Sequence, residues 1–356
     1  MNLNKLQEAM RNLGLNQLIV ASPKQIDYLI NRRFECGERL LVLVVKPDRA
    51  VLVLNELFPI DPINGVELVN YNDCDDGVKV VADLLDSGHV GVDGEWPSAF
   101  LLRLMKIRPE LAISDETDII SDLRAIKNPD EQEKMRKASQ LNDQVMHEVR
   151  KLLKVGVSEA EVAAQIHDLF VEISGGDESF GTIVAFKENC ADPHCMPGNK
   201  VLRAGESIVI DMGCKYQGYC SDMTRTFFIK ENTMKEVYDL VLQANMAAKQ
   251  AVKPGVRFCD VDEAARRVIR DGGYGEYFIH RLGHGIGMSV HEPYDVSGSN
   301  ERIVKAGMCF SIEPGIYLPG DTGVRVEDLV LVTEDGCEVL NHYSKEFEII
   351  GSSVTG

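Results

Sequence analysis

The chain has 356 residues, and 38 Lys or Arg against 56 Asp or Glu give it a formal net charge of −18. A chain this acidic repels phosphate backbones and shows no basic stripe, so nucleic acid is excluded as an expected partner. Nine cysteines without a CxxC pair indicate free thiols in a reducing compartment. Because no apolar run reaches membrane-spanning length, we expect a cytoplasmic protein without a membrane partner.

The first part of the chain alternates helix and strand patterns. An amphipathic helix ends at Gly14, the apolar run 18–22 indicates a buried strand, and Pro23 begins a second helix. The remaining patterns are strands at 40–45, 50–54 and 66–69, a helix near 77–85 and a strand at 89–92. This order predicts an α/β domain over residues 1–124.

A helix N-terminus marks the start of a second domain. Asn128 is a good N-cap residue, Pro129 suits the first helical position, and Glu131 can complete a capping box. We expect this helix to run to about Lys154 and to end at Gly156. The second domain is then expected to span residues 125–356.

The second domain contains an internal repeat. The segment 154–162, KVGVSEAEV, is similar to 253–261, KPGVRFCDV, and each is expected to join one helix to the next. The segment 204–213, AGESIVIDMG, matches 306–315, AGMCFSIEPG, at an offset of 102 residues (306 minus 204). Two matches in the same order predict two similar α/β halves whose matching strands face one cleft.

Each half carries a pair of acidic residues at hairpin spacing. Asp211 ends an apolar strand, and Asp222 lies on the next strand. A turn centred between residues 216 and 217 would place these two residues directly opposite each other, with Cβ atoms about 4.5–5.5 Å apart. We therefore expect two carboxylates side by side in the first half.

The acid pair of the second half is Glu313 and Glu327, which a turn centred on Gly320 would oppose in the same way. Four carboxylates in one apolar cleft repel one another unless cations compensate. Two divalent ions about 3.5–4 Å apart are an arrangement that carboxylates can bridge. His284 lies between two glycines that permit close approach, and it is the candidate nitrogen ligand.

Three segments resemble the signatures of the pita-bread metallopeptidases: VIDMGCKYQGYCSDMTRTF, HRLGHGIGMSVHE and SIEPGIYLPGDTGVRVED. The resemblance is closest to the Xaa-Pro dipeptidase (prolidase) and aminopeptidase P branch, and it covers essentially the whole chain. It implies an α/β (α+β) fold with a creatinase/ribonuclease H-like α/β domain at the N-terminus. A C-terminal pita-bread domain with a pseudo-twofold repeat would follow, and the chain would form a homodimer.

The resemblance also implies a role for each matching acid. The metal ligands would be Asp211, Asp222, His284, Glu313 and Glu327. Asp222 and Glu327 would bridge two divalent ions, with Mn²⁺ expected and Co²⁺ or Zn²⁺ as alternatives. A bridging hydroxide would attack the scissile carbonyl, and Glu313 would carry its proton towards the leaving proline nitrogen.

Further residues of the site follow from the same resemblance. His291 matches the histidine that stabilises the tetrahedral intermediate, and His194 matches the histidine that borders the substrate pocket, so both are predicted to act in catalysis and substrate binding. Arg325 lies two residues before the last ligand and would orient a bridging carboxylate or the substrate carboxylate. Thr224 would donate a hydrogen bond to a ligand, whereas His280 is interpreted as a packing residue.

The chain departs from the family pattern after His291. The family usually has a residue between the glutamate and proline of HExP, whereas here Pro293 follows Glu292 directly. This shortening is expected to reshape the wall of the proline-binding pocket. It leaves the predicted metal ligands in place and affects substrate preference.

These features predict a metal-dependent peptidase that hydrolyses the Xaa-Pro bond at the N-terminus of peptides or in dipeptides. Proline makes that bond a tertiary amide without N–H, which calls for a pocket shaped for the ring. Dipeptidase and aminopeptidase P both use these residues, so the sequence leaves the two open. The alternatives are a methionine-aminopeptidase-like enzyme of the same fold and a non-catalytic pita-bread binding protein.

Overall fold

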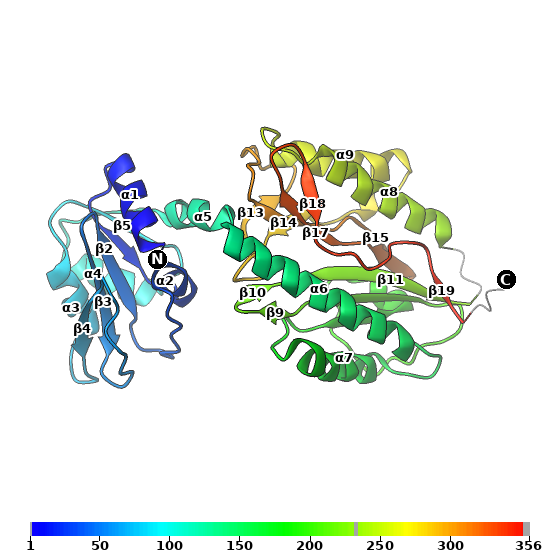
Figure 1. Cartoon of the computed structure of the whole chain (residues 1–356), viewed down its shortest axis with the longest axis horizontal. Helices are drawn as coiled ribbons and strands as arrows, with labels where there is room; N and C mark the ends of the chain where they lie inside the picture. Colours follow the sequence, from blue (N-terminus) through cyan, green and yellow to red (C-terminus); the bar gives the residue numbers. More distant parts are fainter. Residues whose placement is uncertain (1, 231–233, 352–356) are drawn as a thin grey trace. The chain divides into compact units, whose positions relative to one another are not determined.

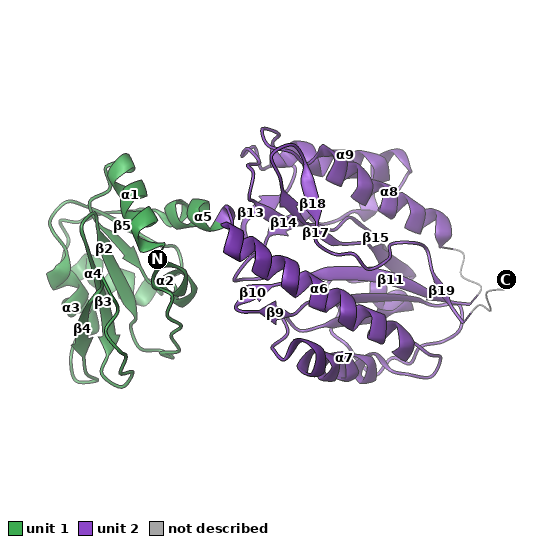
Figure 2. Cartoon of the chain, in the orientation of Figure 1, with its two compact units in different colours: residues 1–124 green, residues 125–356 purple. Residues whose placement is uncertain are grey.

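The computed structural model describes residues 2–230 and 234–351, and the chain divides into two compact units. Unit 1 comprises residues 1–124 and unit 2 comprises residues 125–356 (Figure 2). In the described part of the chain, no helix is both long enough and apolar enough to cross a membrane.

Unit 1 is built around one six-stranded sheet with the order β4-β3-β2-β1-β5-β6 (Figure 1). Its strands are β1 (Leu18–Val20), β2 (Val42–Lys46), β3 (Arg49–Asn55), β4 (Glu67–Tyr71), β5 (His89–Val92) and β6 (Ala112–Asp115). Its helices are α1 (Leu3–Leu13), α2 (Pro23–Ile30), α3 (Gly77–Leu84), α4 (Ser98–Ile107) and α5 (Thr117–Ala125). The expected strands and the first three helices are confirmed, whereas α4, β6 and α5 were missed.

The pattern of α4 explains why it escapes sequence reasoning. Leu104 is its one buried residue, whereas Leu102 and Met105 on the same helix are exposed. Apolar residues therefore occur around the helix instead of forming the single apolar stripe on which a helix prediction depends.

Unit 2 contains two larger sheets, with the orders β19-β11-β8-β7 and β13-β12-β14-β17-β18, and two short hairpins, β9-β10 and β15-β16. The strands of the first sheet and its hairpin are β7 (Ile183–Phe186), β8 (Ser207–Met212), β9 (Lys215–Tyr216), β10 (Tyr219–Cys220), β11 (Met223–Ile229) and β19 (Ile349–Ile350). Those of the second sheet and its hairpin are β12 (Gly283–Gly285), β13 (Glu292–Val296), β14 (Cys309–Ile312), β15 (Gly315–Leu318), β16 (Thr322–Arg325), β17 (Asp328–Val332) and β18 (Cys337–Val339).

Each sheet of unit 2 packs against its own pair of helices. The helices are α6 (Pro129–Leu152), α7 (Glu159–Ser174), α8 (Lys235–Ala251) and α9 (Phe258–Asp271), with short 3₁₀ helices η1 (Lys187–Ala191) and η2 (Gly275–Tyr277). The pair α6–α7 shares an apolar core with β7, β8 and β11, and the pair α8–α9 shares another with β14, β16 and β17. The capping box at Asn128 and Glu131 is present as predicted.

The internal repeat is confirmed by matching hydrogen bonds. The amide of Gly156 donates to the Leu202 carbonyl at 3.0 Å, and the amide of Gly255 donates to the Val304 carbonyl at 3.0 Å. Both glycines have a positive φ, 102° and 90°, which a side chain would strain. Each half therefore reverses its chain between two helices in the same way, and the two halves present equivalent strands to one pocket.

Candidate metal centre

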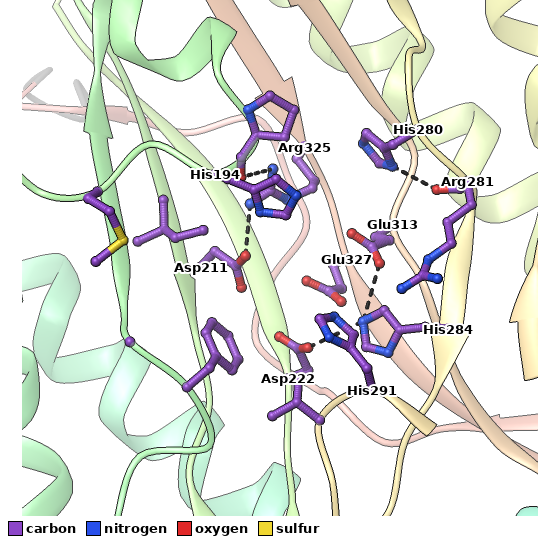
Figure 3. A pocket seen from close by; sticks show the side chains of 16 residues that line it. His194, Asp211, Asp222, His280, Arg281, His284, His291, Glu313, Arg325 and Glu327 are labelled. Atoms are coloured by element: carbon purple, nitrogen blue, oxygen red, sulfur yellow. Dashed lines mark hydrogen bonds and ion pairs between the residues drawn. The ribbon is translucent and has the colours of Figure 1, made fainter. Parts of the chain in front are cut away.

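One cavity of about 610 Å³ in unit 2 brings the predicted site residues together. All eight line it: His194, Asp211, Asp222, His284, His291, Glu313, Arg325 and Glu327. Figure 3 shows the four carboxylates pointing into the same space. Residues separated by more than 100 positions in the chain thus meet in a single pocket.

The carboxylates of the first half lie close together, but the register predicted for them is wrong. Asp211 on β8 pairs with Thr224 on β11, not with Asp222. The reason is a turn displaced by one residue: Gln217 and Gly218 are its two central residues, and both have a positive φ, 48° and 85°. Asp222 therefore lies just before β11 and reaches the pocket from the end of the strand.

The register of the second half is as predicted. The β15-β16 ladder pairs Gly315 with Arg325, and the β14-β17 ladder pairs Ile312 with Asp328, so both ladders have the register of a turn centred on Gly320. Glu313 and Glu327 occupy the gap between these two ladders. Glu313 lies between β14 and β15, and Glu327 lies opposite it between β16 and β17. Their amides donate outward, from Glu313 to the Leu282 carbonyl at 2.8 Å and from Glu327 to the Thr224 carbonyl at 3.1 Å.

His284 is held on β12 by its neighbouring glycines. A Cβ atom at Gly283 would lie 1.9 Å from the carbonyl oxygen of Ser311, and one at Gly285 would lie 2.5 Å from that of Pro293, so any side chain there would push the strands apart. The histidine Nδ1 lies 3.1 Å from the Gly285 carbonyl oxygen, which makes Nδ1 the protonated nitrogen. The Nε2 lone pair then faces the pocket.

The surroundings of Nε2 are acidic. It lies 3.4 Å from Glu313 Oε1 and 3.7 Å from Asp222 Oδ2. Burial lowers the pKa of His284 to about 4, so the ring is neutral at physiological pH. A neutral imidazole nitrogen beside carboxylate oxygens is a ready metal ligand.

The donor atoms fit a divalent cation. Ligand atoms of Asp222, His284 and Glu327 all lie within 4.8 Å of one another. Three buried carboxylate oxygens, Asp211 Oδ1, Asp222 Oδ1 and Glu327 Oε1, have no hydrogen-bond partner among the residues that the structure describes. Burial and the neighbouring carboxylates raise the pKa of Asp222 and Glu327 well above the ordinary value, which is the repulsion that a cation would relieve.

Asp211 and Glu313 lie outside this tightest group of ligand atoms. Asp211 Oδ2 accepts a hydrogen bond from Arg325 Nη2 at 2.8 Å. Glu313 Oε1 accepts one from the Ser311 hydroxyl at 3.1 Å. Each of these two side chains therefore keeps one oxygen fixed by the protein.

Arg325 ties the two halves of the site together. Its Nε donates to Thr224 Oγ1 at 3.0 Å, and Thr224 Oγ1 donates to Glu327 Oε2 at 2.6 Å. Its Nη1 donates to the Tyr317 hydroxyl at 3.0 Å, so all three of its nitrogens are engaged by the protein. The carboxylate that Arg325 contacts is Asp211 and not one of the two acids expected to bridge the metals, whereas the expected hydrogen bond from Thr224 to a ligand is present.

The histidines line the pocket in different settings. The His291 ring stands edge-on to that of His284, with centroids 4.3 Å apart, whereas His194 is exposed in a loop. His280, interpreted from sequence as a packing residue, also lines the pocket, and its Nε2 lies 2.8 Å from the Tyr317 hydroxyl. The one signal in the sequence that His280 belongs to the site was its position four residues before His284. Its contact with Tyr317 spans 37 residues, so no local pattern indicated it.

The shortened HEP segment turns its glutamate away from the pocket. Glu292 forms a buried ion pair with Lys127, with Nζ 3.3 Å from Oε2 and both side chains 2% exposed. Its other oxygen, Oε1, accepts a hydrogen bond from the Ser289 amide at 3.1 Å. His291 and Val290 line the pocket instead.

Comparisons with known proteins agree with this architecture. Residues 133–334 match the model of metallopeptidase family M24, and residues 2–126 match that of the creatinase/prolidase N-terminal domain. An uncharacterized peptidase of Staphylococcus aureus (strain USA300) is 37% identical over 357 residues, covering 96% of this chain and 99% of that relative. The predicted fold class is thereby confirmed.

Two solved structures are similar over nearly the full length. A recombinant prolidase from Thermococcus sibiricus has a TM-score of 0.92 and 34% identity, covering 98% of both chains. A dipeptidase from Pyrococcus horikoshii OT3 has a TM-score of 0.91 and 34% identity, covering 98% of this chain and 100% of that one.

Proposed function

The chain belongs to metallopeptidase family M24, and from that premise we propose that it is a two-metal exopeptidase that hydrolyses the Xaa-Pro bond. The observation that carries the proposal is the convergence of four carboxylates and one neutral histidine on one pocket, where three buried carboxylate oxygens lack hydrogen-bond partners in the described part of the chain. The similarity of the whole chain to a prolidase supports the choice of bond.

The proposed metal ligands are Asp211, Asp222, His284, Glu313 and Glu327. This mostly oxygen donor set with one imidazole suits Mn²⁺, with Co²⁺ or Zn²⁺ as alternatives. When bound, divalent ions here would lower the pKa of a water molecule and polarise the scissile carbonyl.

Side chains of the pocket are proposed to transfer the proton, bind the substrate and position a ligand. Glu313 faces the pocket with one oxygen held by Ser311, and it is proposed to accept a proton and return it to the proline nitrogen. His291 and His194 line the same pocket and are proposed to donate hydrogen bonds to the substrate. Arg325 is proposed to keep Asp211 in position through its 2.8 Å contact.

The pocket lining combines apolar and polar side chains. Phe180, Ile183 and Met196 contribute apolar surface, and His280 and Arg281 are among the polar groups. A cavity of about 610 Å³ is within the size range of small-molecule sites, about 300–1,000 Å³. A short peptide fits such a space with an apolar side chain on one side and its carbonyl groups on the other.

The alternative functions have less support. A methionine-aminopeptidase-like enzyme is disfavoured by the match of residues 2–126 to the creatinase/prolidase N-terminal domain. A non-catalytic binding protein is disfavoured by the complete donor set around His284. The homodimer and the cytoplasmic location stay predictions.

The experiment compares hydrolysis of Ala-Pro, Ala-Pro-Gly and Ala-Gly, with added Mn²⁺ and with a chelator. We expect cleavage of Ala-Pro in Mn²⁺, none with the chelator, and none of Ala-Gly. Cleavage chiefly of Ala-Pro-Gly would identify an aminopeptidase P. A protein that binds Mn²⁺ and cleaves neither proline peptide would refute the proposed substrate class.

A further inference from the structure

The backbone that carries the site's carboxylates needs support of its own. Four carboxylates crowd into one pocket, and like charges at such close range repel one another unless a cation compensates. Glu313 and Glu327 lie in the gap where one β-ladder stops and the next begins. Regular strand pairing does not continue through these positions: their own amides donate to the Leu282 and Thr224 carbonyls, and a long hydrogen bond of 3.4 Å, from the Val326 amide to the Pro314 carbonyl, joins the two segments.

Asn245, a fully buried residue of α8, bridges the two backbone segments at this gap. Its Nδ2 donates to the carbonyl oxygen of Ile312 at 3.0 Å and to that of Val326 at 3.2 Å. These carbonyls belong to the residues immediately before Glu313 and Glu327. One amide group thus adds two hydrogen bonds that tie together the backbone segments from which the second acid pair projects.

Two other fully buried asparagines act on the first acid pair. Asn341 Nδ2 donates to the carbonyl oxygen of Asp222 itself at 3.2 Å, while its Oδ1 accepts from the Leu329 amide at 2.6 Å. Asn142 on α6 donates from Nδ2 to the carbonyl oxygen of Met212 at 2.9 Å. Met212 directly follows Asp211.

The carboxamide oxygens indicate that Asn142 and Asn245 act here as hydrogen-bond donors. The Oδ1 atoms of Asn142 and Asn245 are buried and have no hydrogen-bond partner within residues 2–230 and 234–351. A buried acceptor without a partner destabilises the fold, so each of these two amides carries a cost at Oδ1 that its Nδ2 hydrogen bonds must offset. Their Nδ2 groups reach backbone beside the acids from both helix pairs, Asn142 from α6 and Asn245 from α8.

We propose that Asn142, Asn245 and Asn341 form an asparagine frame, a set of buried positioning residues that holds the four carboxylates at metal-binding separation before any cation arrives. This inference rests on the proposed function for the identity of the acids as metal ligands. The frame acts through the main chain and touches neither substrate nor metal.

The test uses Asn245→Ala, with Val241→Ala as the matched control. Val241 lies one turn earlier on α8, is equally buried, and its loss removes packing but no hydrogen bond. In metal-free protein, hydrogen exchange of residues 309–313 and 326–328 is expected to be faster in Asn245→Ala than in Val241→Ala. Calorimetric titration with Mn²⁺ is expected to show an affinity ten- to a hundredfold lower, about the range for lost supporting contacts.

The outcomes separate the frame from the function. Exchange and Mn²⁺ affinity in Asn245→Ala that equal those of Val241→Ala would overturn the frame. If the wild-type protein takes up no Mn²⁺, the proposed function fails, and the exchange experiment on metal-free protein alone decides whether the frame exists. Should Asn245→Ala not fold, Asn341→Ala is tested in its place, with exchange followed at residues 221–223.

Discussion

Breaking the buried ion pair between Lys127 and Glu292 is expected to destabilise unit 2 strongly, and replacing both partners much less. Both side chains are 2% exposed, and Nζ lies 3.3 Å from Oε2. Removing one member leaves the other charge buried and uncompensated, which costs about 3–5 kcal/mol. Replacing both with apolar residues of similar size removes two desolvation penalties, so the double variant should recover most of that loss.

The assay is urea unfolding of Lys127→Met, Glu292→Met and the double variant, followed by circular dichroism. With a slope of about 3 kcal/mol/M for a unit of this size, a loss of about 3–5 kcal/mol moves the midpoint by about 1–1.7 M. Trp96 is the one tryptophan of the chain and lies in unit 1, so its fluorescence reports on that unit separately. Additive losses in the double variant would refute the reasoning, because independent sites add and a coupled pair does not.

Three further predictions concern single residues. Burial, as the largest cause, raises the pKa of Asp93 from 3.8 to about 6, so the stability that this carboxyl contributes is full below pH 3.8 and is lost as pH rises through about 6. Urea unfolding followed by Trp96 fluorescence should show unit 1 losing about 3 kcal/mol between pH 3.5 and 8, and Asp93→Asn should remove that slope; a slope unchanged in the variant would show that another group causes it. Glu327→Gln should abolish Ala-Pro hydrolysis and lower metal content while the circular dichroism spectrum persists, and full activity would contradict the ligand assignment. His291→Ala should keep the metal, measured by elemental analysis, but lose most of the turnover, whereas unchanged turnover would remove it from the mechanism.

Sequence patterns predicted local features well because their causes are local. The capping box at Asn128 needs only the glutamate three residues later, and both of its hydrogen bonds are present. The turn at Gly320 depends on one glycine with a positive φ of 74°, and the register that follows from it is correct. The prediction for the turn near Gln217 was wrong for a local reason too. Gln217 has a positive φ although it is not a glycine, so the sequence did not mark it as a central residue of the turn.

The parts of the site that escaped prediction depend on contacts distant in sequence. The hydrogen bond between His280 and Tyr317 spans 37 residues, and the Lys127–Glu292 pair spans 165. No periodicity or motif connects such positions, since each partner alone is typical of an exposed or packing residue. The eight residues predicted to form the site do meet in one pocket. They could be predicted because the motif resemblance and the repeat both relate positions that are distant in the sequence.

The way Arg325 and Thr224 join the two halves has a consequence for the order of assembly. Arg325 reaches Asp211 across 114 positions, and Thr224 reaches Glu327 across 103. Contacts of this range form late, after each half has collapsed on its own local contacts. A cation arriving earlier would find only part of its ligands, so we expect divalent metal to leave the refolding rate unchanged and to slow unfolding instead. In stopped-flow experiments, a refolding rate that rises with Mn²⁺ would show that the ion organises the halves as they meet. Slower unfolding alone would show that the ion binds after folding and stabilises only the native state.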